Sequence, residues 1–252
     1  FSADTLLAED GSFGNDSDGT LTVAFIGGSL TDAQSFITYQ GRAYGGKSWT
    51  NTICRYLEEK FPNRQIKPIN AGVTGTTSDY GALRFENSIL QYGPDIIFIE
   101  YTVNDMGFSS REDSQKYMEA MVRMSQQLDK IPVIVFMYTA NVDGKDTDQH
   151  IRWEQGKNWK QEIADYYGLG SINIYDYIYS LFEASEYDVF YDFIEATKQY
   201  GKNGEGWDVH GGYKYYAEAI IKALDENPSS LIKHPDVKTE WFENGSYKDT
   251  AY

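Results

Sequence analysis

The sequence predicts an α/β protein with a three-layer α/β/α, flavodoxin-like fold around a central five-stranded parallel sheet. Two observations lead to this prediction. Short, mostly apolar runs alternate with helical patterns along most of the 252 residues, which is the spacing of strand–helix–strand units. The first run, residues 21–26, is rich in β-branched residues and ends at two glycines, as a strand does when it leaves a buried parallel sheet.

The elements follow one another along the chain. The predicted strands are the apolar runs at residues 21–26, 65–70, 95–101, 132–138 and 171–175. The predicted helices cover residues 49–60, 78–92, 111–128, 151–167, 176–200 and 213–225. Ser48 suits the N-cap of the first helix, Pro62 helps to end it, and Gly93-Pro94 separates the second helix from the next strand. Right-handed crossovers leave few topologies for this order, and the flavodoxin-like sheet is the natural one.

Three segments are expected. Residues 1–20 are polar and rich in Gly, Asp and Ser, which indicates an extended lead-in. Residues 21–227 hold every predicted strand and helix and form one domain with a full core. Residues 228–252 lack a helical pattern, and they either pack back on the domain as an extension or begin a linker to a further module. Because the chain begins at Phe1, we expect a processed or trimmed chain whose targeting segment is out of view.

Composition argues against several partners. The formal net charge of −16 repels nucleic acid and anionic membranes, so we expect neither as a partner and favour a neutral substrate. Aromatic residues make up 15% of the chain, which suits either an aromatic core or platforms for sugar rings. The single cysteine, Cys54, excludes an internal disulfide and is expected to be a packed thiol, which is compatible with the cytoplasm and with secretion. The sequence contains neither a P-loop nor a dinucleotide fingerprint, and the acidic cluster at 143–148 lacks calcium-loop spacing, so no cofactor or metal is expected.

Ser29 is the candidate nucleophile. It follows the first strand and two glycines, which let the chain turn sharply and put the next residue at the carboxyl edge of the sheet. A serine hydroxyl needs a base, and acyl transfer needs hydrogen-bond donors for an oxyanion. Of the three histidines, His234 precedes a proline in the tail and His150 begins a predicted helix, whereas His210 lies in a glycine-rich loop without an obvious packing role. We therefore favour His210 over His150 as the base.

Oxyanion donors are available on three loops. The backbone N–H groups of Ser29 and of residues 72–75 can approach a ligand closely because glycine has no side chain. Asn104 follows the third strand, and its side-chain amide can point into the same space. Each feature alone is also explained by a turn or a helix cap. Together, on loops at the same edge of the sheet, they favour one catalytic site.

The order of these motifs resembles that of the SGNH (GDSL) hydrolase family of esterases and lipases. The nucleophile block GDSLT stands here as GGSLT at residues 27–31, and the second block as NAGVTGT at residues 70–76. The resemblance implies that Gly75 is the oxyanion donor of that second block. The third block, GxND, appears as TVND at residues 102–105, with its asparagine at position 104, and His210 matches the last block.

The chain departs from the family pattern in two places. Gly28 replaces the aspartate of the first block, a change that leaves the nucleophile and its loop in place. The family has DxxH in the last block, but Trp207 occupies the position of the acid, and the nearest aspartate, Asp208, is closer to the histidine. Either Asp208 orients His210, or a backbone carbonyl near Trp207 does so in a Ser–His dyad. Asp208 is slightly favoured.

The resemblance also implies a reaction. The GGSLT form with NAGVTGTTSDYGALRF is similar to bacterial carbohydrate esterases, which implies a serine esterase that removes acetyl groups from saccharides through an acetyl-enzyme on Ser29. Trp207 and Asp105 are the candidate substrate contacts, and Trp49, Trp153 and Trp159 are further candidates for a sugar platform. A carbohydrate-binding module beyond residue 252 fits this interpretation. The alternatives are a lipid-directed esterase or thioesterase, an O-acetyltransferase with the same site, and a saccharide-binding protein without catalysis.

Overall fold

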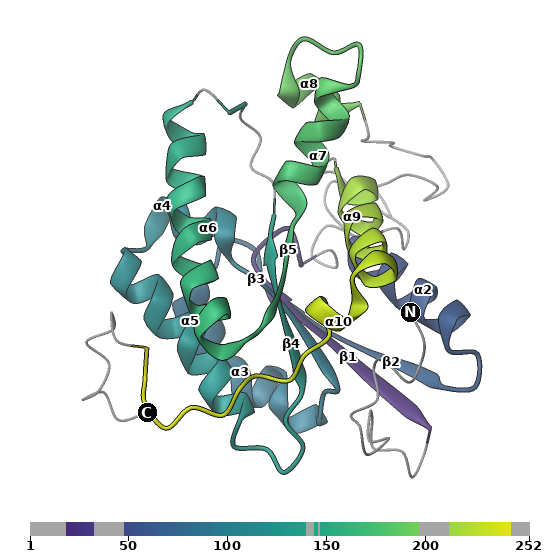
Figure 1. Ribbon diagram of the computed structural model, residues 1–252, viewed down its shortest axis with the longest axis vertical. Coiled ribbons are helices and arrows are strands. Elements are labelled where there is room, and N and C mark those ends of the chain that lie inside the picture. The colour runs from purple at the N-terminus through teal and green to yellow at the C-terminus, as the bar shows by residue number, and fades with distance from the viewer. Residues whose placement is uncertain (1–18, 33–47, 140–143, 146, 197–211, 243–252) are drawn as a thin grey trace.

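A five-stranded parallel sheet lies at the centre of the protein, between two layers of helices (Figure 1). The computed structural model describes residues 19–32, 48–139, 144–145, 147–196 and 212–242. The strands are β1 (Thr20–Gly27), β2 (Gln65–Gly72), β3 (Ile96–Glu100), β4 (Val133–Tyr138) and β5 (Gly170–Asn173). Their spatial order is β2-β1-β3-β4-β5, and every neighbouring pair is parallel. This is the flavodoxin-like order, so the predicted fold class is confirmed.

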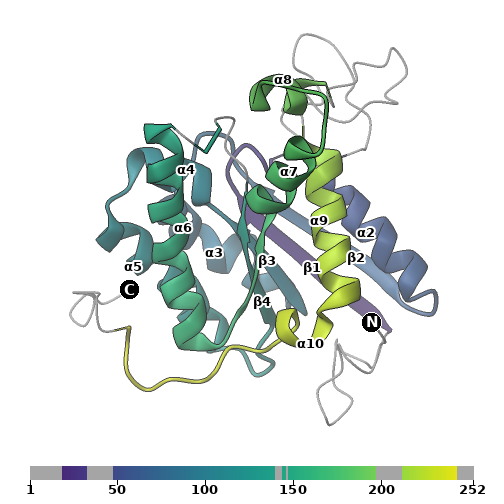
Figure 2. The ribbon, with the colours of Figure 1, turned by 45° about the horizontal axis from the view of Figure 1, so that its top comes forward.

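Helices cover both faces of the sheet (Figure 2). One face carries α3 (Ser78–Ser88), α4 (Thr102–Phe108), α5 (Arg111–Ser125) and α6 (Asp148–Tyr167). The other carries α2 (Trp49–Lys60), α7 (Ile174–Glu183) and α9 (Tyr213–Glu226). Three short helices complete the described part of the chain: η2 (Leu90–Tyr92), α8 (Phe190–Glu195) and α10 (Pro228–Leu231).

The central strands are apolar along their length because both of their faces are buried. Phe25 of β1 stacks on Phe98 of β3 with ring centroids 5.4 Å apart, and the ring of Trp49 in α2 meets Phe25 edge-on at 5.3 Å. The N-terminus of α2 is capped as predicted, since the Ser48 hydroxyl accepts a hydrogen bond from the N–H of Asn51 at 3.2 Å. Local signals and burial therefore agree in this part of the fold.

Two predicted helices differ from the structure, and short helices were missed. The helix predicted over 78–92 ends at Ser88, and a 3₁₀ turn carries the chain to Gly93, which ends it in the left-handed region at φ 58°. The helix predicted over 176–200 is broken between α7 and α8, and its last residues lie outside the described residues. Helix α4 was not predicted, because its seven residues are too short to show a helical period.

The described part of the tail, residues 228–242, lies against the domain: α10 contacts α9 and β5, and the residues after it bond to the region of α5. The Gln126 side chain donates to the carbonyl of Asp236 at 2.9 Å, and the N–H of Phe242 donates to the Glu119 carboxylate at 2.7 Å. No helix among the described residues is both long and apolar enough to cross a membrane. The division at residues 20 and 227 stays a prediction.

Candidate active site

Loops from three neighbouring strands meet at the carboxyl edge of the sheet. The parallel register pairs Gly27, the last residue of β1, with both Gly72 of β2 and Glu100 of β3. The chain therefore leaves these three strands at nearly the same level. Just beyond this level, the N–H of Val73 donates to the carbonyl of Gly27 at 3.0 Å and joins the first two loops. The first two loops carry the serine and the glycine of the predicted site, whereas Asn104, expected on the third loop, lies in the first turn of α4.

A tight turn carries Ser29. The carbonyl of Gly28 accepts hydrogen bonds from the N–H groups of Thr31 at 3.2 Å and Asp32 at 3.0 Å, which puts Ser29 and Leu30 at the tip. We call residues 28–32 the Ser29 turn. The carbonyls at the tip are fixed by two side chains from helices on the same face of the sheet.

These two side chains are Trp49, the first residue of α2, and Tyr213, the first residue of α9. The indole N–H of Trp49 donates to the carbonyl of Leu30 at 2.7 Å. The hydroxyl of Tyr213 donates to the carbonyl of Ser29 at 3.3 Å. Ser29 is half-buried between these anchors. The start of α9, which follows the loop of His210 in the chain, thus lies against the Ser29 turn.

Asn104 connects the first loop to the second. Its side-chain amide donates to the carbonyl of Thr76 at 2.7 Å. The same amide nitrogen lies so close to Gly28 that a Cβ at that position would be only 2.5 Å away. A side chain at position 28 would require Asn104 to move, so the glycine suits the observed position of the Asn104 amide.

Gly75 lies at the open side of the second loop. Its φ of 75° is in the left-handed region that glycine adopts without strain, and a Cβ built there would meet no atom within 4 Å among those described. The loop is tied to the Ser29 turn through Asp32, whose carboxylate accepts from the N–H and the hydroxyl of Thr74, both at 3.0 Å. Gly75 is therefore held by its neighbour and keeps an open face.

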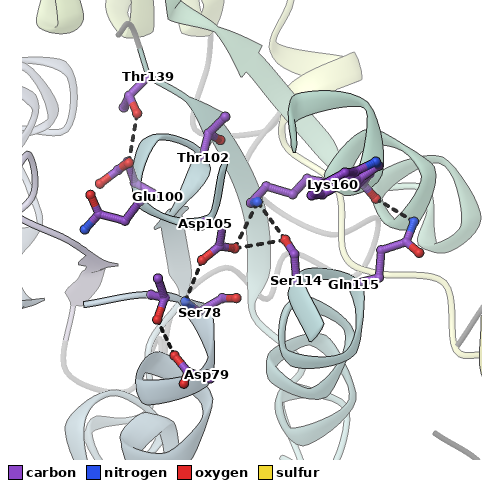
Figure 3. A network of polar contacts seen from close by, with 12 residues as sticks. Ser78, Asp79, Glu100, Thr102, Asp105, Ser114, Gln115, Thr139 and Lys160 are labelled. Carbon is purple, nitrogen blue, oxygen red and sulfur yellow. Dashed lines mark hydrogen bonds and ion pairs between the residues drawn. The ribbon is translucent and has the colours of Figure 1, made fainter. Parts of the chain in front are cut away.

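Asp105 is in the interior, although it is next to Asn104 in the chain (Figure 3). Its carboxylate is fully buried and accepts from the N–H of Ser78 and the hydroxyl of Ser114, both at 2.9 Å. It also forms an ion pair at 2.9 Å with Lys160 of α6, whose side chain is equally buried. This arrangement leaves Asp105 no open face for a ligand. In place of the substrate contact suggested by the sequence, we propose that Asp105 braces α3, α5 and α6 against α4.

Glu100 is a residue of this site that the sequence analysis missed. It ends β3 directly beneath the Ser29 turn and is 2% exposed. Its carboxylate accepts from the N–H of Gly28 at 3.4 Å and from the hydroxyls of Thr31 at 3.3 Å and Thr139 at 2.8 Å. Burial raises its pKa above the usual range of a glutamate. The available signal was a single carboxylate in an otherwise apolar strand.

The predicted base and its partners, His210, Asp208 and Trp207, lie outside the described residues. The competing candidate, His150, is packed between aromatic rings, 4.8 Å from Tyr175 and 5.6 Å from Trp153 between ring centroids. No described residue offers a hydrogen-bond partner to its Nδ1, and burial lowers its pKa. His150 thus has the environment of a core residue.

The other tryptophan candidates differ in exposure. Trp49 and Trp153 are buried, and the indole N–H of Trp153 donates to the carbonyl of Thr139 at 2.7 Å, so neither offers a face to a sugar. Trp159 is half-buried on α6. Within the described ranges, no group of three or more His, Cys, Asp or Glu side chains could hold a metal ion.

Comparison with known families identifies the chain. The profile of the GDSL-like lipase/acylhydrolase family matches residues 25–210, which spans the Ser29 turn, the two loops described above and the predicted histidine. The chain belongs to this family. The predicted resemblance is therefore confirmed. No curated protein sequence matches the chain.

Solved structures show the same fold of this family. A two-domain esterase active on acetylated mannans, crystallised with mannopentaose, is 23% identical with a TM-score of 0.63, over 89% of this chain and 54% of that one. This chain thus spans about half of that protein. An acetylxylan esterase from Geobacillus stearothermophilus is 14% identical with a TM-score of 0.62, over 81% of this chain and 94% of that one. A hydrolase from the metagenome of Lake Arreo is 15% identical with a TM-score of 0.61, over 84% of this chain and 96% of that one.

Proposed function

We propose that this GDSL-family protein is a serine esterase that removes O-acetyl groups from oligo- or polysaccharides. The observation that carries the proposal is the contact of Asn104 with both Gly28 and Thr76, which brings the start of α4 against the loops that hold Ser29 and Gly75. The substrate class is taken from two structural neighbours that act on acetylated mannan and acetylated xylan. The net charge of −16 also favours a neutral saccharide over a polyanion.

In the proposed reaction, the hydroxyl of Ser29 attacks the ester carbonyl while His210 takes its proton. The backbone N–H groups of Ser29 and Gly75 and the side-chain amide of Asn104 stabilise the oxyanion. The C–O bond to the sugar then breaks, His210 gives its proton to the departing sugar oxygen to form the free hydroxyl, and an acetyl-enzyme remains on Ser29. Water activated by His210 then releases acetate and restores the enzyme.

The amide of Asn104 has the capacity for this role. A primary amide has two N–H donors, and the carbonyl of Thr76 uses one of them. That bond fixes the plane of the amide, so the second N–H has a defined direction. A donor fixed before the substrate arrives needs no reorganisation in the transition state.

The role of His210 is supported by its place in the chain. His210 comes just before α9, and the first residue of that helix, Tyr213, donates to the carbonyl of Ser29. We propose that Asp208, or a backbone carbonyl near Trp207, orients the imidazole. Trp207 is also the proposed sugar contact. A carbohydrate-binding module beyond residue 252 stays part of the proposal, since the mannan esterase has a second domain.

The test is the Ser29→Ala variant, measured on p-nitrophenyl acetate and on a panel of acetylated mannans and xylans. We expect the wild type to release p-nitrophenol and acetate and the variant to lose both activities. Ser230→Ala, which changes an exposed serine on α10, is the matched control and should keep the wild-type rates. Full activity in Ser29→Ala would refute the nucleophile. A preference for octanoyl over acetyl esters would refute the acetyl specificity and favour a lipid-directed esterase.

A further inference from the structure

The buried carboxylate of Glu100 binds the Ser29 turn on both sides of its tip, at Gly28 and at Thr31. One of its oxygens, Oε2, accepts from the backbone N–H of Gly28 at 3.4 Å and from the hydroxyl of Thr31 at 3.3 Å. The residues between these two donors are Ser29 and Leu30. The other oxygen, Oε1, accepts from the hydroxyl of Thr139 at 2.8 Å, just beyond the end of β4. The carboxylate therefore links the turn to the two central strands β3 and β4.

The end of β1 leaves room for this carboxylate. A Cβ on Gly27 would lie 2.8 Å from Oε2 of Glu100 and 2.4 Å from the hydroxyl of Thr31. Position 27 must therefore be glycine for these two side chains to meet above the strand. Gly27 and Thr31 are the first and last residues of the GGSLT motif, and both are explained by contact with Glu100.

This carboxylate differs from an ordinary structural charge. The contacts recorded for it among the described residues come from neutral donors, with no cation among them. Burying a carboxylate without a cation is unfavourable, and hydrogen bonds offset only part of that cost. What the carboxyl group provides is one oxygen, Oε2, that accepts from two donors of the turn, and such bonds are about twice as strong when the acceptor is ionised. Two of these bonds end on the backbone and side chain that define the Ser29 turn.

We propose that Glu100 is a positioning residue of the esterase: through Gly28 and Thr31 its carboxylate fixes the turn that presents the hydroxyl and the backbone N–H of Ser29. This inference rests on the proposed function. Glu100 lies beneath the turn and acts through it. Its removal leaves every reacting group in the chain but loosens the geometry in which they meet.

Glu100→Gln is the informative variant. A glutamine keeps the size of the side chain, and its carbonyl can accept from Gly28, which can only donate, while its NH₂ faces the hydroxyl of Thr139. The charge is lost and the bonds to the turn weaken. Because small displacements at a reacting centre cost up to about 100-fold in rate, we expect kcat to fall about 10- to 100-fold with KM changed less than about twofold.

Glu119→Gln is the matched control. Glu119 of α5 is also a fully buried glutamate without a salt bridge among the described residues. Its carboxylate accepts hydrogen bonds from the hydroxyl of Tyr167 at 2.6 Å and from the N–H of Phe242 at 2.7 Å. If Glu100 were only a structural residue, both variants would lose stability and neither would lose intrinsic activity per folded molecule. We expect Glu119→Gln to keep the wild-type kcat.

The decisive readout is the rate at which a fluorophosphonate labels Ser29, because this reagent tests the serine and its oxyanion donors without assuming a saccharide substrate. We expect Glu100→Gln to be labelled more slowly by the same factor as its kcat. Labelling at the wild-type rate would overturn the positioning role alone. A wild type that is not labelled at all would overturn the proposed function and the positioning role with it.

A second pair of variants covers the case in which Glu100→Gln does not fold. Thr31→Val removes one donor to Glu100 without a change of shape, and Thr31→Ser keeps the hydroxyl. We expect slower labelling in Thr31→Val and recovery toward the wild-type rate in Thr31→Ser. Equal labelling rates in the two variants would overturn the inference.

Discussion

Glu100 and Asp105 are close together in the chain and equally buried, but their partners differ in kind (Figure 3). Asp105 is paired with the buried ammonium of Lys160 and also bonds to α3 and α5. Glu100 is bound by neutral donors and bonds to the Ser29 turn. Asp105, which has a cation as partner, thus joins the helices on one face of the sheet. Glu100, which is bound by neutral donors, lies under the predicted site. The comparison predicts that damage to the first reduces stability and damage to the second reduces activity.

The largest effect on stability is expected from Lys160→Met. This change leaves Asp105 buried without its cation, which costs about 3–5 kcal/mol in comparable buried pairs. Urea denaturation should show this loss in the free energy of unfolding. The folded fraction should still be labelled by a fluorophosphonate at close to the wild-type rate, because the Ser29 turn keeps Glu100.

Two controls make the Lys160 prediction specific. Lys222→Met breaks an ion pair with Glu226 in which both side chains are more than half exposed, and it should leave the free energy of unfolding close to the wild-type value. The double variant Asp105→Asn/Lys160→Met removes the buried charge along with its partner and should be more stable than Lys160→Met alone. A double variant less stable than the single one would show that charge compensation is not the reason for the pair.

The next largest effect is expected from Asn104→Ala, which removes the proposed oxyanion donor next to Asp105 in the chain. Removing one oxyanion donor lowers kcat by about 100- to 1,000-fold in well-studied acyl-transfer enzymes. We expect a loss of this size on p-nitrophenyl acetate and a small loss of stability, since one hydrogen bond to Thr76 disappears. The control is Asn87→Ala, an exposed asparagine on α3. A kcat within a few-fold of the wild type would remove Asn104 from the proposed oxyanion site.

Sequence reasoning worked well for the strands that are buried on both faces, because such strands consist almost entirely of apolar residues. Strands β1, β3 and β4 are buried on both faces, so their apolar runs were visible without any tertiary information. The positions of Ser29, Gly75 and Asn104 beyond the ends of β1, β2 and β3 were also predicted, because the register of a parallel sheet brings the ends of these strands together.

The wrong predictions concern the direction in which side chains point, which the sequence alone does not show. Asp105 was predicted to contact substrate because it follows Asn104, but successive residues of a helix point about 100° apart, and α4 turns the aspartate toward Lys160. Glu100 was included only as part of the strand predicted over residues 95–101, since its partners Thr31 and Thr139 are distant in the chain. Short elements such as α4 and η2 contain too few residues for a period to show.

The smallest predicted effect concerns pH, and it comes from the two buried glutamates that form no salt bridge among the described residues. Burial raises the pKa of both Glu100 and Glu119 in the folded protein above the value of about 4.3 for an exposed glutamate. The folded state then binds protons more tightly than the unfolded state, so this contribution to stability is complete below about pH 4.3 and is lost as the pH rises through the folded-state pKa values.

Glu119→Gln removes one of these titrating groups without touching the predicted site. In this variant the free energy of unfolding should fall less steeply than in the wild type as the pH is raised above about 4.3, which urea midpoints at a series of pH values would measure. Glu226→Gln, an exposed glutamate in α9, is the control and should leave the slope nearly unchanged. A wild-type slope in Glu119→Gln would mean that Tyr167 and Phe242 stabilise the ionised carboxylate as well as water does.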